Sequence, residues 1–106
     1  MKKEEYAKLT KALERAEQEA LKYADIDDGG TCNFDSPMIM LEGTSEAKLK
    51  ALYGEHYGVW KPYPKCYVIG HKLMRGQGNR HTKMAEAFSQ SLNDSGFTSY
   101  VRYVMD

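Results

Sequence analysis

Apolar residues recur at steps of three and four positions near the start of the chain, between charged residues. Such spacing places side chains on one face of a helix. The intervening residues are strong helix formers, so we expect a long amphipathic helix over residues 3–24. The stripe suits packing on the rest of the chain, or a coiled-coil seam of about three heptads through which two copies would form a homodimer. It consists of Tyr6, Leu9, Leu13, Ala16, Ala20 and Tyr23 or Ala24.

Shorter patterns follow this helix. Residues 25–36 contain Gly29-Gly30 among Asp and Asn residues, which predicts a loop. Short apolar or alternating runs predict strands over residues 37–41, 57–61, 65–73 and 97–105. Helical spacing predicts one helix that Thr44 caps and a second that Asn79 caps and Gly96 closes.

The elements follow the order helix, then β-α-β-β-α-β. This is the order of split β-α-β, or ferredoxin-like, folds, so we predict an α+β fold with a small three- or four-stranded sheet. The strand over residues 57–61 has the weakest pattern, and without it three strands remain. The length of 106 residues fits one domain, with residues 1–24 as the N-terminal helix and residues 25–106 as the α+β core.

The composition, 42% hydrophobic and 28% charged, is typical of a globular protein in water. No apolar run approaches the ~18 residues of a membrane span, and the first residues lack the apolar region of a signal peptide. Cys32 and Cys66 form no C-x-x-C pair and suit a reducing compartment, a disulfide between them being the less favoured alternative. We therefore expect a cytoplasmic protein with no membrane partner.

Charge is unevenly distributed although the net charge is zero. Residues 25–46 contain six acidic residues and no Lys or Arg, whereas residues 61–83 contain six basic residues and no acid. The two blocks either neutralise each other in the fold or face different partners. A zero net charge argues against non-specific binding of duplex nucleic acid.

The centre of the basic block is a glycine-bearing turn that leads into a predicted helix. A helix N-terminus has unpaired N–H groups and a positive dipole end, which favour an anion. The turn lacks the P-loop and dinucleotide-binding patterns. It is either a tight strand-to-helix connection or a site for a phosphate-bearing small molecule or nucleic acid. The residues that would contact the anion are Arg75, Gly76, Gly78, Asn79, Arg80, His81 and Lys83.

Aromatic residues cluster between residues 53 and 67. Tyr57, Trp60 and Tyr63 could stack on a base attached to that phosphate. Core packing and a protein-binding hot spot are the alternatives. The Lys/Arg-Gly-Phe/Tyr run of RNA-recognition sheets is absent from the predicted strand over residues 65–73.

No catalytic residue, metal site or cofactor is predicted. The acidic loop fails as an EF-hand because position twelve, counted from Asp25, is Ser36 rather than Glu. The histidines lack metal-ligand spacing, and the cysteines lack a supporting motif. An enzyme that uses Cys32 or His81 is therefore unsupported, although the sequence leaves the question open.

Two segments, Asp28 to Pro37 and Gly76 to Asp106, resemble a group of small uncharacterised proteins carried by phages and mobile elements of gut bacteria. The resemblance implies a setting in which small proteins act by binding a nucleotide signal or by blocking a host defence protein. A blocking inhibitor, in the manner of an anti-CRISPR, would present the acidic block to a basic surface of its target. The contacting residues would be Asp25, Asp27, Asp28 and Asp35.

Overall fold

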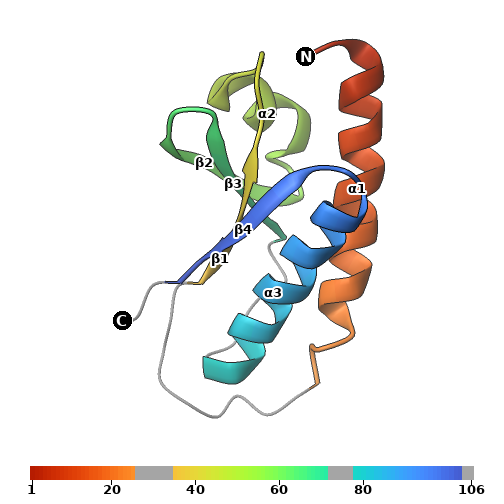
Figure 1. Cartoon of the computed structure of the whole chain (residues 1–106), viewed down its shortest axis with the longest axis vertical. Helices are drawn as coiled ribbons and strands as arrows, with labels where there is room; N and C mark the ends of the chain where they lie inside the picture. The colour runs from red at the N-terminus through yellow and green to blue at the C-terminus, as the bar shows by residue number, and fades with distance from the viewer. Residues whose placement is uncertain (26–34, 72–77, 104–106) are drawn as a thin grey trace.

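A four-stranded antiparallel sheet lies against helices in the computed structural model of the chain, which describes residues 1–25, 35–71 and 78–103 (Figure 1). The predicted α+β class, with a long N-terminal helix and a small sheet, is confirmed. In chain order the elements are α1 (Lys3–Leu21), β1 (Ser36–Met40), α2 (Glu46–Tyr53), β2 (Tyr57–Tyr63), β3 (Cys66–His71), α3 (Gly78–Asp94) and β4 (Thr98–Arg102).

The strands lie in the order β2-β3-β1-β4, and each neighbouring pair is antiparallel. The strands β1 and β3 are therefore central, and β2 and β4 form the edges. The strand with the weakest sequence pattern is present as β2 and continues beyond residue 61 to Tyr63. The sheet accordingly has four strands rather than three.

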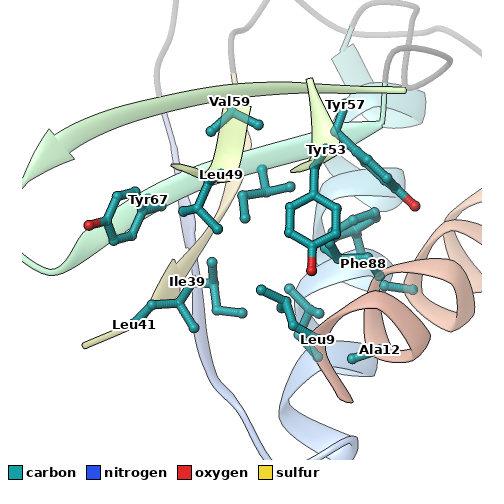
Figure 2. Close-up of a cluster of buried hydrophobic side chains, with 14 of the residues drawn as sticks. Leu9, Ala12, Ile39, Leu41, Leu49, Tyr53, Tyr57, Val59, Tyr67 and Phe88 are labelled. Atoms are coloured by element: carbon teal, nitrogen blue, oxygen red, sulfur yellow. The ribbon is translucent and has the colours of Figure 1, made fainter. Parts of the chain in front are cut away.

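Alternate strand residues face the helices and form one buried core with them (Figure 2). The helix α1 lies alongside α3, and its residues Leu9, Leu13, Ala16 and Ala20 are fully buried (Figure 1). The apolar stripe of α1 is thus used within the chain, as the packing interpretation predicts. A second copy of the protein would have to bind another face of α1.

Local signals in the sequence locate two helix ends. Gly96 has φ 95°, and the amides of Gly96 and Phe97 donate to the carbonyls of Asn93 and Leu92, respectively. This pattern is a Schellman motif, which confirms the predicted closing glycine of α3. The predicted cap of α2 is wrong by one residue, because the Ser45 hydroxyl accepts from the Lys48 amide. The Thr44 hydroxyl instead hydrogen-bonds the Tyr6 hydroxyl at 2.7 Å.

Candidate functional site: the open face of the sheet

The strand residues that point away from the core form a second surface of the sheet. The strand register places Trp60 beside Val68, Val68 beside Met38, and Met38 beside Tyr100. This row crosses all four strands. We call the surface the open face, because none of the described helices contributes to it. Its residues are Ser36, Met38, Met40, Gly58, Trp60, Tyr63, Cys66, Val68, Gly70, Thr98, Tyr100 and Arg102.

A bulge in β2 brings a second aromatic ring to the open face. Trp60 and Tyr63 are three residues apart, and in a regular strand they would point to opposite faces. The register of β2 shifts between them, so Trp60 lies beside Val68 while Tyr63 lies beside Cys66. Because Val68 and Cys66 share a face of β3, both aromatic side chains lie on that face.

The aromatic rings of the open face are accessible to solvent. The side chains of Trp60, Tyr63 and Tyr100 are 42%, 56% and 60% exposed. The guanidinium carbon of Arg102 lies 5.3 Å from the centre of the Trp60 ring, within cation–π range. Three exposed rings and one cation are thus presented together by the two edge strands.

The two central strands carry both exposed and buried side chains on this face, and Met40 on β1 is 40% exposed. Cys66 and Val68 on β3 are buried, although neither belongs to the main core. The Cys66 thiol donates to Met38 Sδ at 3.6 Å, and burial raises the pKa of the thiol. A raised pKa lowers the thiolate fraction, so Cys66 is poorly suited to act as a nucleophile.

Electrostatics of the sheet favour an anion over a cation. The four strands contain no Asp or Glu, and Arg102 places a positive charge on the open face. Arg102 lies opposite Ser36, at the end of the sheet where β3 also ends.

The described part of the basic turn is held by the chain itself. Thr82 Oγ1 donates to Asp35 Oδ2 at 2.7 Å, and His81 Nε2 lies 2.5 Å from the Asp35 backbone oxygen. Arg80 Nη1 donates to the carbonyl of Ala24, just beyond α1, at 3.0 Å. The Asp35 carboxylate therefore lies beside the fifth residue of α3, near the helix end at which an anion is stabilised.

These contacts bring the acidic and basic blocks together. Lys65 Nζ lies 3.1 Å from Glu42 Oε1, and the Lys61 amide donates to Glu46 Oε1 at 3.2 Å. Asp35 is only 5% exposed, so it is not presented to a partner as the inhibitor hypothesis supposed. Among the acidic-block residues of that hypothesis, Asp25 is exposed, while Asp27 and Asp28 lie outside the described residues.

The remaining residues of the predicted phosphate site are only partly described. Arg75 and Gly76 lie outside the described residues, and of Gly78 and Asn79 only their place in the first turn of α3 is described. Lys83 is exposed and pairs with Glu86 at 3.8 Å. It lines a groove of about 520 Å³ between α1 and α3, away from the open face.

Tyr57 lies apart from the other predicted stacking residues. Its ring is in the core and only 7% exposed, because it alternates with the outward-facing positions of β2 (Figure 2). Its hydroxyl donates to Glu17 Oε2 at 3.2 Å, and burial together with this carboxylate raises its pKa. We therefore leave Tyr57 out of the site.

Sequence reasoning missed Tyr100 and Arg102 as site residues. The sequence predicts the strand that carries them, but it does not show that this strand pairs with β1 or that Arg102 lies near Trp60.

Comparison with known proteins adds no assignment: no family model, no curated protein and no solved structure matches this chain. Across the described residues, no group of three or more His, Cys, Asp or Glu is placed to hold a metal ion. None of the helices in that part of the chain combines the length and the apolarity that a membrane span requires.

Proposed function

We propose that this protein is a non-enzymatic binding protein that recognises a phosphate-bearing ligand with an aromatic base, a nucleotide or nucleic acid. The observation that carries the proposal is the open face, where exposed Trp60, Tyr63 and Tyr100 accompany Arg102 on strands without an acidic residue. Bases stack on aromatic side chains and on guanidinium planes, with about 1–3 kcal/mol per base. Such a ligand agrees with a cytoplasmic location.

Arg102 is the residue we propose for the first phosphate contact. It combines a fixed positive charge with a planar fork of donors, and its stacking on Trp60 holds it beside the base-binding ring. The basic turn at residues 75–83 is a second, weaker part of the proposal. A phosphate there would compete with the Asp35 carboxylate, which already accepts from Thr82.

The strand order supports a finer description of the fold. The two β-α-β units are β1-α2-β2 and β3-α3-β4. In the order β2-β3-β1-β4, β3 lies between the two strands of the first unit, and β1 lies between the two strands of the second. We propose that the chain from β1 to β4 is a split β-α-β, or ferredoxin-like, unit. RNA-recognition sheets of this kind carry stacking aromatics in a defined motif, whereas here the rings come from the edge strands. The fold analogy therefore adds little to the functional argument.

The test uses Trp60, which is the single tryptophan of the chain and therefore the main intrinsic fluorophore of the site. Nucleoside monophosphates, free nucleosides and inorganic phosphate are titrated while its emission is recorded. We expect saturable quenching by nucleotides, weaker binding of nucleosides, and a loss of affinity in Arg102→Ala. Tyr23→Ala removes a comparably exposed ring away from the open face and should bind normally. No saturable signal from nucleotides or oligonucleotides would refute the proposal.

A second candidate function is the blocking of a host defence nuclease. The open face joins aromatic rings with Met38, Met40 and Arg102, the residue types enriched at the centres of protein interfaces. The test is a nuclease cleavage assay with Trp60→Ala and Asp25→Asn variants. Loss of inhibition in Trp60→Ala alone assigns the open face, whereas loss in Asp25→Asn with strong salt dependence assigns the acidic block.

A further inference from the structure

The geometry points to a single strand of nucleic acid, rather than a mononucleotide, as the ligand of the open face. We infer that two bases of one strand rest on Trp60 at one edge of the sheet and on Tyr100 at the other, with the nucleotides between them crossing β3 and β1. This inference rests on the proposed function, and it adds the length, the strandedness and the path of the ligand.

The rings at the two edges of the sheet are widely separated. Trp60 and Tyr100 are the ends of one row that crosses four strands through Val68 and Met38. Three inter-strand intervals of about 4.8 Å place their Cα atoms roughly 14 Å apart. A single base covers one aromatic ring, so a mononucleotide leaves the other edge unused. A strand of several nucleotides can use both.

The surface between the rings combines small, apolar and charged groups. Val68 and Cys66 are buried, and the next row contains Gly58 and Gly70, which have no side chains. The Arg102 side chain reaches across this row, because its guanidinium lies over the Trp60 ring. A ligand that runs from one aromatic edge to the other therefore passes Arg102. Stacking on a protein ring requires an unstacked base, which a single strand offers and an intact duplex does not.

The open face carries little charge. Arg102 is the one charged side chain among the open-face residues, and the strands contain no acid that would repel phosphates. Stacking should consequently supply more of the affinity than phosphate contacts do. Binding to single strands weakens with a salt slope of about −0.7 per neutralised phosphate, so we expect a shallow slope of roughly −0.7 to −1.4.

The experiment is a length series read by Trp60 fluorescence. Thymidine monophosphate and oligothymidylates of two, four and eight nucleotides are compared with a blunt duplex of the same length as the longest strand. Affinity should rise at least tenfold from the mononucleotide to the tetranucleotide and then level off, and the duplex should bind more weakly than the octanucleotide. Tyr100→Ala should lose most of the rise in affinity with length, because only one edge of the sheet then carries a ring for a base.

Two further variants make the result specific. Tyr100→Phe retains the ring and should retain the rise with length, whereas Tyr23→Ala should match the unmodified protein. Tyr100 is exposed, so its truncation should leave the thermal transition in place. Equal affinity for all lengths, equal affinity for the duplex, or an undiminished rise in Tyr100→Ala would overturn the strand inference and leave the proposed function standing. Absence of binding to every nucleotide and oligonucleotide would overturn both.

Discussion

Removal of the Asp35 side chain should lower the free energy of unfolding more than removal of an exposed carboxylate does. Asp35 is buried, and it joins the segment before β1 to the N-terminal part of α3 through its 2.7 Å hydrogen bond from Thr82. A hydrogen bond to a charged group contributes about 1.5–3 kcal/mol. A carboxylate near a helix N-terminus adds about 0.3–1 kcal/mol.

We therefore expect Asp35→Ala to lower the free energy of unfolding by about 2–4 kcal/mol. In a domain of this size that loss corresponds to a fall in Tm on the order of 10 °C or more. Asp35→Asn keeps an acceptor oxygen and should lose roughly half as much. Asp94→Asn is the matched control, because it removes an exposed carboxylate at the opposite end of α3. Urea denaturation followed by circular dichroism measures all three.

A double-mutant cycle isolates the contact between the two side chains. Asp35 and Thr82 both have other interactions, so the single variants report more than this hydrogen bond. Combining Asp35→Ala with Thr82→Val should give a coupling free energy of about 1–3 kcal/mol. A coupling free energy below about 0.5 kcal/mol would refute the reasoning that this hydrogen bond stabilises the packing of the segment before β1 on α3.

Three other predictions concern stability. Gly96→Ala should cost about 1 kcal/mol in urea denaturation, because φ is 95° there and no neighbouring atom lies close enough for a new methyl to contact. Ser99→Ala should cost about 1–3 kcal/mol in the same assay, since the buried Ser99 hydroxyl bonds both Ser89 and the Met38 carbonyl. The raised pKa of Tyr57 means that the native state holds this proton above pH 10.0, the ordinary pKa, while the unfolded state releases it. The contribution of this protonated hydroxyl to stability is therefore fully present below pH 10.0 and is lost as pH rises beyond that value. The free energy of unfolding should fall above pH 10.0, and it should fall less steeply in Tyr57→Phe.

The candidate site was only half visible in the sequence. The cluster around Trp60 and Tyr63 identified the strand that carries two of the three exposed rings, because aromatics beside basic residues are a local feature. Tyr100 and Arg102 were invisible as site residues, since nothing in their own segment indicates that β4 lies three strands away from β2 on one sheet. A helix does begin at the basic turn, but it starts at Gly78, so the predicted cap Asn79 lies within it. The partner of this helix start, Asp35, is more than forty residues distant in sequence.

The sequence by itself determined the α+β class, the buried stripe of α1 and the end of α3 at Gly96. These features depend on periodicity and backbone preference within a few residues, which no distant contact has to supply. Only the tertiary structure decided that the bulge in β2 turns Trp60 and Tyr63 to the same face, and that Asp35 meets Thr82. The physical reason is that side-chain direction in a strand inverts with every inserted residue, and that charge pairing depends on distance in space, which strand order sets.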